Sequence, residues 1–189
     1  MTPKRNKKRA VFLDRDGVIN VSPGGGFVTD WKQFRFLPGV PKALRILKER
    51  RWMVIVVSNQ SGVGRGIMTK GKLEEITWQM QEAVSQAGGR INAVYYCIHH
   101  PEDDCSCRKP KIGLLKRAAR KFSIDLKRSF VIGDDERDIL MGHRAGCCTV
   151  LVLSGKQTRR TIKRLSVSPH RVASTLLQAV RWIVSSDRR

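Results

Sequence analysis

The sequence predicts an α/β fold, a doubly wound parallel sheet of the Rossmann-like type with helices on both faces and no inserted cap domain. Short apolar runs of strand length alternate along the chain with longer amphipathic segments of helix length. Polar or glycine-rich residues follow most of these apolar runs, as expected where buried parallel strands end at the ligand-binding edge of a sheet. The 189 residues, 41% of them hydrophobic, are enough for one domain with a core. We expect this domain to span residues 10–189, preceded by a basic tail over residues 1–9.

The first half of the chain supplies three predicted strands and two predicted helices. Buried strands are expected at apolar runs such as 52–57, and Thr69 and Gly88 can cap and end the second helix. In chain order we expect a strand over 11–13, a loop over 24–36, a helix over 37–51, a strand over 53–58, a glycine-rich loop over 59–68, a helix over 69–87 and a strand over 91–97.

The second half continues the alternation. Pro110 permits a helix start after a loop rich in Cys, His and Pro, and Gly146 closes a later helix. Cys147 and Cys148 lie in an apolar stretch and are interpreted as small core residues. In chain order we expect a loop over 98–110, a basic amphipathic helix over 112–122, a strand over 129–133, a helix over 136–145, a strand over 149–153, a basic helix in the tail and a last helix over about 174–185.

The chain carries a formal net charge of +21. The excess collects in two segments without acidic residues, 4–9 and 156–171. A basic surface attracts polyanions such as phosphorylated substrates or nucleic acid. A solvated basic surface is the simpler interpretation, because no basic segment interleaves with aromatic residues as in proteins that bind single strands. Nucleic acid is therefore not the expected partner, although the charge leaves it open.

The sequence predicts a cytoplasmic protein without a membrane partner. The apolar runs are far shorter than a bilayer span, and the basic N-terminus is not followed by the apolar core of a signal peptide. The five cysteines are an odd number without a secretion signal, which argues against a disulfide framework. We expect a monomer.

Four polar motifs lie at the ends of four predicted strands. Any one of them could be a helix cap, a turn or a surface charge, but their common position at strand ends predicts a shared site. In chain order they are Asp14-Arg15-Asp16-Gly17, Ser58-Asn59-Gln60-Ser61-Gly62, Arg108-Lys109-Pro110 and Gly133-Asp134-Asp135-Glu136-Arg137-Asp138. In this order they resemble the four motifs of the haloacid dehalogenase (HAD) superfamily of phosphotransferases, over residues 10 to 153.

A closer resemblance lies within that superfamily. Residues 12–20, 58–66 and 97–110 look like the corresponding segments of the D-glycero-D-manno-heptose 1,7-bisphosphate phosphatases. The sister group, the histidinol-phosphate phosphatases, shares the Cys- and His-rich loop but typically has Asp where Ser61 stands. The resemblance therefore favours the heptose group.

The motifs predict phosphoryl transfer to an aspartate. Asp14 is the expected nucleophile, and Asp16, two residues along the strand end, faces the same side as general acid and base. Ser58 and Lys109 are expected to contact the transferring phosphoryl group. Mg²⁺ is expected on Asp14, the main-chain carbonyl of Asp16, and Asp134.

Further residues are expected around the substrate. Arg108 can bind a second phosphate or a hydroxyl, and Asp138, one helical turn after Asp134, is expected to position Lys109 by a salt bridge. Asp135 departs from the family pattern, which has Lys or a small residue there; its carboxylate could hold Mg²⁺ through water or weaken anion binding. The expected substrate contacts are Asn59, Gln60, Ser61, Arg108, Gly26 and Phe27, the last two beside an apparent short insertion at 23–25.

The loop over 97–107 contains a candidate zinc site. Cys97, His99, Cys105 and Cys107 provide three thiolates and one imidazole, a closed tetrahedral set typical of structural Zn²⁺. His100 is the competing imidazole, and the resemblance favours His99. A bound zinc ion would stiffen the loop that delivers the cations at 108–109.

The leading hypothesis is an Mg²⁺-dependent phosphatase that removes the C7 phosphate of a heptose 1,7-bisphosphate, a small phosphorylated sugar, on the route to nucleotide-activated heptose and lipopolysaccharide. Histidinol-phosphate hydrolysis and nucleic-acid 3′-phosphatase activity are the alternatives within the same chemistry. A zinc-stabilised nucleic-acid-binding module without catalysis is the alternative of another class, and it predicts no loss of function in Asp14→Asn.

Overall fold

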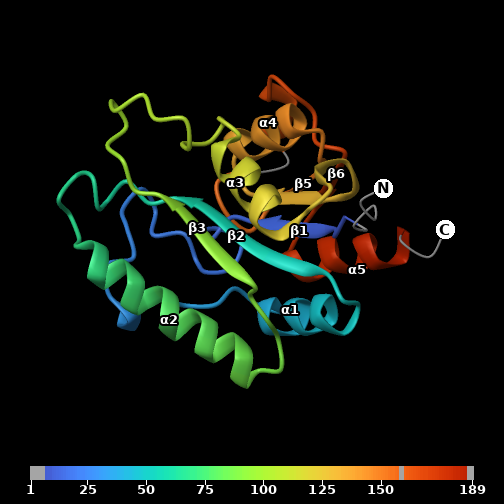
Figure 1. Ribbon diagram of the computed structural model, residues 1–189, viewed down its shortest axis with the longest axis horizontal. Coiled ribbons are helices and arrows are strands. Elements are labelled where there is room, and N and C mark those ends of the chain that lie inside the picture. Colours follow the sequence, from blue (N-terminus) through green and yellow to red (C-terminus); the bar gives the residue numbers. More distant parts are fainter. Residues whose placement is uncertain (1–6, 158–159, 187–189) are drawn as a thin grey trace, which may run out of the picture.

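The computed structural model describes residues 7–157 and 160–186. Six strands form one parallel sheet in the order β3-β2-β1-β4-β5-β6 (Figure 1). The strands are β1 Ala10–Leu13, β2 Met53–Asn59, β3 Ala93–Cys97, β4 Phe130–Gly133, β5 Cys148–Val152 and β6 Arg171–Ala173. The order turns outward in both directions from β1 and β4, so the predicted doubly wound α/β fold is confirmed.

Helices cover both faces of this sheet. They are α1 Val40–Glu49, α2 Lys70–Gln86, α3 Gly113–Phe122, α4 Glu136–Ala145 and α5 Leu176–Ser186. Figure 1 shows α1, α2 and α5 on one face, with α3 and α4 on the other. Successive strand residues point to opposite faces, so Val11 and Leu13 join one core cluster while Ala10 and Phe12 join the other.

The central strands are buried from both sides. All four residues of β1 are fully buried, and five of the seven residues of β2 are buried. Such strands read as continuous apolar runs rather than as alternating patterns, which is why the sequence indicates them clearly. Both strands end in polar residues, which places those residues at the carboxyl edge of the sheet.

The helix ends follow the predicted signals. The Thr69 hydroxyl accepts a hydrogen bond from the backbone nitrogen of Lys72 at 3.1 Å, which caps α2. Gly146 ends α4 in the left-handed conformation, with φ of 73°. In the described ranges, none of the helices has the length and hydropathy that crossing a bilayer requires.

The C-terminal region differs from the prediction. The expected basic helix of the tail is wrong: the described part of this segment forms only a single 3₁₀ turn, Ile162–Arg164, while residues 158–159 lie outside the described residues. The segment has few apolar residues, so a helix there would gain little from packing. A sixth strand, β6, was not expected; it extends the sheet beside β5.

The start of the chain also belongs partly to the fold. Residues 1–6 of the predicted basic tail lie outside the described residues. Lys8 forms a β-bridge with Ile124, and its backbone nitrogen donates to the carbonyl of Ser123 at 2.9 Å. This bridge ties the segment before β1 to the turn that follows α3.

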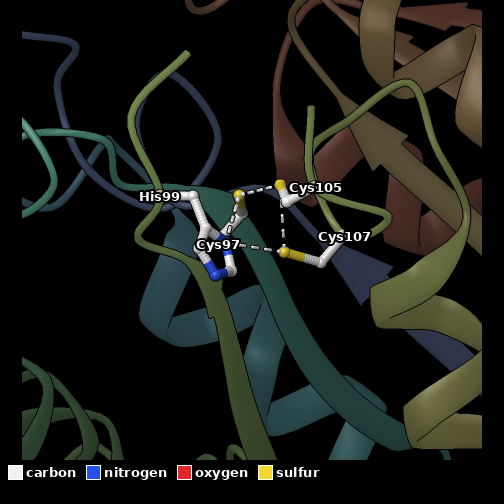
Figure 2. Close-up of side chains that lie close together, drawn as sticks. All are labelled: Cys97, His99, Cys105 and Cys107. Atoms are coloured by element: carbon white, nitrogen blue, oxygen red, sulfur yellow. Dashed lines mark hydrogen bonds between the residues drawn. The ribbon is translucent and has the colours of Figure 1, made fainter. Parts of the chain in front are cut away.

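The loop between β3 and α3 turns back on itself at the carboxyl edge of the sheet. Cys97 is the last residue of β3, and Cys105 and Cys107 return to it from the far side of the loop (Figure 2). Two glycines allow close packing here, because a Cβ atom on Gly64 would lie 2.4 Å from the His100 nitrogen and one on Gly113 would lie 2.4 Å from the Ser106 carbonyl oxygen. The loop is thus packed against the rest of the edge.

Candidate active site

The ends of β1, β2 and β4 surround one pocket of about 180 Å³ at the carboxyl edge of the sheet. It is lined by residues of all four predicted motifs and by residues 22–23 and 25–27 of the loop that follows β1. Its lining residues include Asp14, Asp16, Gly26, Phe27, Ser58, Asn59, Ser61, Arg108, Lys109, Asp134, Asp135, Arg137, Asp138 and Lys156. The convergence predicted from the sequence is therefore present in the structure.

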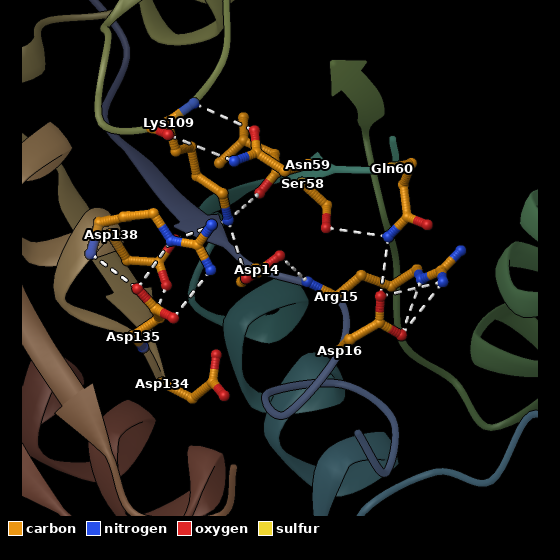
Figure 3. Close-up of polar contacts among 12 residues, drawn as sticks. Asp14, Arg15, Asp16, Ser58, Asn59, Gln60, Lys109, Asp134, Asp135 and Asp138 are labelled. Atoms are coloured by element: carbon orange, nitrogen blue, oxygen red, sulfur yellow. Dashed lines mark hydrogen bonds and ion pairs between the residues drawn. The ribbon is translucent and has the colours of Figure 1, made fainter. Parts of the chain in front are cut away.

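Lys109 forms the centre of a buried ion-pair network. Its Nζ lies 2.8 Å from Asp14 Oδ2 and 2.6 Å from Asp138 Oδ1, and it donates to the Val57 carbonyl at 3.3 Å (Figure 3). Burial lowers the pKa of Lys109, but Asp138 and Asp14 outweigh that effect and hold the pKa above its ordinary value. Lys109 therefore carries a positive charge beside Asp14, and the predicted salt bridge to Asp138 is seen.

Asp134 lies across the pocket from Lys109. Its Oδ2 accepts from the backbone nitrogen of Lys156 at 2.8 Å. Gly17 allows its approach: a Cβ atom there would lie 2.3 Å from Asp134 Oδ2, and its φ of 85° is one that glycine adopts freely. Burial, and then the charge of Asp14, raises the pKa of Asp134 to about 6.

Asp14, Asp134 and Asp138 form a carboxylate cluster whose ligand oxygens lie within 4.8 Å of one another. Lys109 balances only part of that negative charge. Burial, and then the charge of Asp14, raises the pKa of Asp134, and a hard divalent cation bound there would favour its ionised form. Asp14 and Asp138 both contact Lys109, so the assignment of Mg²⁺ to Asp14 and Asp134 stays a prediction.

Asp16 occupies a different part of the pocket, held by three side chains. Arg15 binds it through Nε and Nη2 at 3.0–3.3 Å. The Asn20 and Gln60 amides donate to its two oxygens at 2.8 and 2.7 Å. Sequence reasoning missed Arg15 and Asn20, although Arg15 stands between the two aspartates of the first motif and is fully buried.

The second motif both lines and supports the pocket, which Ser58, Asn59 and Ser61 line. Asn59 pairs with the backbone of Lys109, accepting from its nitrogen at 3.0 Å and donating to its carbonyl at 3.3 Å. Gln60 is fully buried behind Asp16 and also donates to the Ser58 hydroxyl at 3.2 Å, which differs from the predicted direct substrate contact. Ser58 and Ser61 line the pocket.

Asp135 begins helix α4 and is paired on both sides. It binds the Arg137 guanidinium through two contacts of 2.9 Å, and the Lys156 Nζ lies 3.1 Å from its Oδ2. Burial raises the pKa of Asp135, but Arg137 and Lys156 outweigh burial and hold the pKa well below its ordinary value. Neither Arg137 nor Lys156 was expected at the site, because each reads in the sequence as an ordinary surface charge.

The thiol cluster brings together the four predicted zinc ligands. Cys97 Sγ lies 3.4 Å from Cys105 Sγ, and Cys107 Sγ lies 3.5 Å from Cys105 Sγ and 3.2 Å from His99 Nδ1 (Figure 2). Tetrahedral zinc with Zn–S bonds of about 2.3 Å needs sulfur atoms about 3.8 Å apart, so the donor set fits. His100 points elsewhere: its Nδ1 accepts from the Glu102 nitrogen at 3.4 Å.

The chain is similar in sequence to known phosphatases. A family model described as HAD-hydrolase-like matches residues 106–179. The D-glycero-beta-D-manno-heptose-1,7-bisphosphate 7-phosphatase of Helicobacter pylori is 39% identical over 141 residues, covering 74% of this chain and 80% of the relative. Its namesake from Vibrio cholerae is 34% identical over 181 residues, covering 92% and 93%.

A solved structure resembles the chain along nearly its whole length. It is the D,D-heptose 1,7-bisphosphate phosphatase of B. bronchiseptica complexed with magnesium and phosphate. The TM-score is 0.88 at 33% identity, with 94% of this chain and 99% of the other covered. A putative HAD-like phosphatase from Mesorhizobium loti follows, with a TM-score of 0.79, 27% identity and coverage of 95% and 87%.

Proposed function

The chain belongs to the family of D-glycero-D-manno-heptose 1,7-bisphosphate 7-phosphatases, and we propose that it removes the C7 phosphate of a heptose 1,7-bisphosphate. One observation carries the proposal. Asp14 lies at the end of β1 in contact with a buried cation, Lys109, while Asp16 stands two residues away in the same pocket. This arrangement provides a nucleophile, a positive charge for the phosphoryl oxygens, and a second carboxyl group for proton transfer.

The proposed reaction proceeds in two displacements. A carboxylate oxygen of Asp14 attacks phosphorus while the bond from phosphorus to the sugar oxygen breaks, and Asp16 gives its proton to that oxygen. Water then attacks the phosphorus of the aspartyl-phosphate. Asp16 takes a proton from this water, the phosphorus–Asp14 bond breaks, and inorganic phosphate is released. Ser58 and Lys109 hold the phosphoryl oxygens throughout.

Asp16 is oriented for this reaction by Arg15, Asn20 and Gln60. Their three sets of hydrogen bonds hold both carboxylate oxygens of Asp16 in place. The same three residues then fix the direction in which the proton is delivered.

Two metal ions complete the proposal. Mg²⁺ would be held by Asp14, Asp134 and the main-chain carbonyl of Asp16, and it supplies charge neutralisation for attack by a carboxylate on a phosphate anion. Zn²⁺ would be held by Cys97, His99, Cys105 and Cys107 in a structural role. The position of Cys107, two residues before Lys109, supports this role, because order in the loop fixes the catalytic cation.

The alternatives use the same chemistry on other substrates. Histidinol phosphate has one phosphate, whereas the pocket holds Arg108, Arg137 and Lys156 in addition to Lys109, which favours a substrate with two. A nucleic-acid 3′-phosphatase rests on the net charge of +21 alone. The cytoplasmic location, the monomeric state and the place in lipopolysaccharide synthesis stay predictions.

A substrate panel tests the proposal. Phosphate release would be measured with Mg²⁺ and Zn²⁺ present, on both anomers of heptose 1,7-bisphosphate, histidinol phosphate and a 3′-phosphorylated oligonucleotide. We expect kcat/KM to be highest for a heptose bisphosphate and Asp14→Asn to remove turnover. A preference for histidinol phosphate or the oligonucleotide would overturn the sugar assignment, and undiminished turnover in Asp14→Asn would overturn the chemistry.

A further inference from the structure

A second group of charges lies in the same pocket as Asp14 and takes no part in the reaction described above. It consists of Asp135, Arg137 and Lys156. We propose that Arg137, oriented by Asp135, binds the second phosphate of the substrate, the one that does not react, with Lys156 and Arg108 beside it. The inference rests on the proposed function and assigns this chain's own residues to the distal end of the bisphosphate.

The Arg137 guanidinium is held in one plane and is still open to a ligand. Its Nε and Nη2 each donate to Asp135 at 2.9 Å, and its backbone nitrogen donates to Asp135 Oδ1 at 3.0 Å. Within the described residues Asp135 is its only side-chain partner. A guanidinium has five N–H donors, so three remain for another acceptor. The side chain is 42% exposed where it lines the pocket.

Asp135 connects the proposed second phosphate site to the reacting site through hydrogen bonds. It is the N-cap of α4, and its backbone nitrogen donates to Asp138 Oδ2 at 3.3 Å in a capping box. The other oxygen of Asp138 holds Lys109. Figure 3 shows Asp135 and Asp138 together beside Asp14 and Asp134. The first turn of α4 therefore fixes the separation between the two anion sites, which suits a substrate with two phosphates at a set distance.

The net charge of the group formed by Asp135, Arg137 and Lys156 favours binding of an anion, even though Asp135 is negative. Arg137 and Lys156 both pair with Asp135, so this group carries a net positive charge. Arg108 lines the same pocket, and its buried Nη1 has no hydrogen-bond partner within the described residues. A buried donor without an acceptor is costly, and phosphate oxygens would provide the acceptors. Asp135 thus orients a cation instead of simply repelling the substrate.

A purely structural role for Asp135 and Arg137 predicts a different experimental outcome. If Asp135 and Arg137 only stabilised the first turn of α4, their replacement would change the free energy of unfolding without changing which substrate is preferred. The readout that separates the two roles is discrimination, the ratio of kcat/KM for heptose 1,7-bisphosphate to kcat/KM for heptose 7-phosphate. These two substrates share the reacting phosphate and differ only in the distal one.

The first test replaces Arg137. We expect Arg137→Gln to lower the ratio by about tenfold to a hundredfold, the scale of losing a charge-assisted hydrogen bond, mainly through KM for the bisphosphate. Arg137→Lys should retain part of the ratio, because it keeps the charge but not the planar fork. Arg144→Gln, in the last turn of the same helix and outside the pocket, is the matched control and should keep the wild-type ratio.

The second test asks whether Asp135 acts through Arg137. Asp135→Asn should lower the ratio in the wild-type background, because Arg137 loses the charged carboxylate that orients it. In the Arg137→Gln background the same change should not lower it, since there it only removes a negative charge. An increase of the ratio in both backgrounds would show that Asp135 simply repels the substrate, and the positioning role would be wrong.

The outcomes also separate this inference from the proposed function. A wild-type enzyme that hydrolyses both heptose phosphates with equal kcat/KM would overturn the second phosphate site and leave the phosphatase proposal standing. An unchanged ratio in Arg137→Gln would overturn the role of Arg137 in the same way. A wild-type enzyme that hydrolyses neither compound would overturn the proposed function, and the inference with it.

Discussion

Two ligand clusters lie at the same edge of the sheet and are built in opposite ways. The carboxylate cluster joins Asp14, Asp134 and Asp138, which come from strand ends or the first turn of α4, and its members are largely buried. The thiol cluster joins Cys97, the last residue of β3, to the loop that follows, and Cys97 is its one fully buried member. The first has an excess of negative charge beside an open pocket, whereas the second has four donors facing one another.

This difference indicates separate tasks. A catalytic metal needs free coordination positions and a rigid base, which strand ends at the carboxyl edge of the sheet provide. A structural metal needs a closed donor set and can itself supply the order that a loop lacks. The two clusters meet at Lys109, which follows Cys107 by two residues in the loop and contacts Asp14 and Asp138 in the pocket.

The largest effect is expected from the carboxylate cluster. Asp14→Asn replaces the nucleophile with an amide, so turnover of heptose bisphosphate should fall by at least about 1,000-fold. Zinc content should stay at the wild-type value, because Asp14 does not contact the thiol cluster. Turnover within tenfold of wild type, measured by phosphate release, would contradict the assignment of Asp14.

The second-largest effect is expected from Lys109, which follows the thiol cluster in its loop and contacts the carboxylate cluster. Lys109→Met leaves Asp14 and Asp138 facing each other without their cation, and we expect the metal-free protein to lose about 3–5 kcal/mol of unfolding free energy. Urea denaturation at neutral pH measures this loss. Adding Asp138→Asn in the same chain should recover part of it, since one of the unpaired carboxylates is then gone. A loss below about 1 kcal/mol would show that the buried network does not stabilise the fold.

The thiol cluster should affect catalysis only indirectly. Cys107→Ser should lower zinc content and reduce kcat/KM by up to about 100-fold, because misplacing Lys109 by about 1 Å is enough for such a loss. The matched control is Cys148→Ser, a cysteine at the start of β5 outside the cluster, which should keep both zinc and activity. Loss of zinc without any change in kcat/KM would show that the loop orders itself without the ion.

The smallest effect is a dependence of stability on pH. The folded pKa of Asp134, about 6, lies above its ordinary value of 3.8, so its ionised form destabilises the metal-free protein. That cost is absent below about pH 4 and complete above about pH 6. Asp134→Asn should therefore stabilise the metal-free protein by about 2 kcal/mol at pH 7 and by little at pH 4. Equal effects at both pH values would contradict the burial of this charge.

The burial of the strands explains which parts of the fold could be predicted from the sequence. The central strands were predictable because burial on both faces leaves continuous apolar runs, as in β1 and β2. Strand β6 was missed because its three residues, Arg171 to Ala173, have no such run and pair with β5 through backbone hydrogen bonds. The same basic region was predicted to be helical, although it offers no apolar face.

The candidate site likewise has residues that the sequence predicts and residues that it does not. The convergence of Asp14, Ser58 and Asp134 followed from strand ends, since topology places them together, whereas Lys109 reaches the pocket from the loop after β3. The supports of Asp16 and the Asp135–Arg137–Lys156 group were not predictable, because they depend on side-chain conformations and on a distant turn. Lys156, for example, lies 21 residues beyond Asp135 and reaches it only through the turn after β5.

Chemical trapping of the aspartyl-phosphate on Asp14 tests the central claim most directly. The enzyme would be mixed with Mg²⁺ and heptose 1,7-bisphosphate and quenched in acid during turnover. Borohydride would then reduce any acyl phosphate to the alcohol. We expect peptide mass spectrometry to find homoserine at position 14, dependent on substrate and absent without it. Turnover with residue 14 unmodified, or with the label on Asp16 or Asp134, would contradict the account.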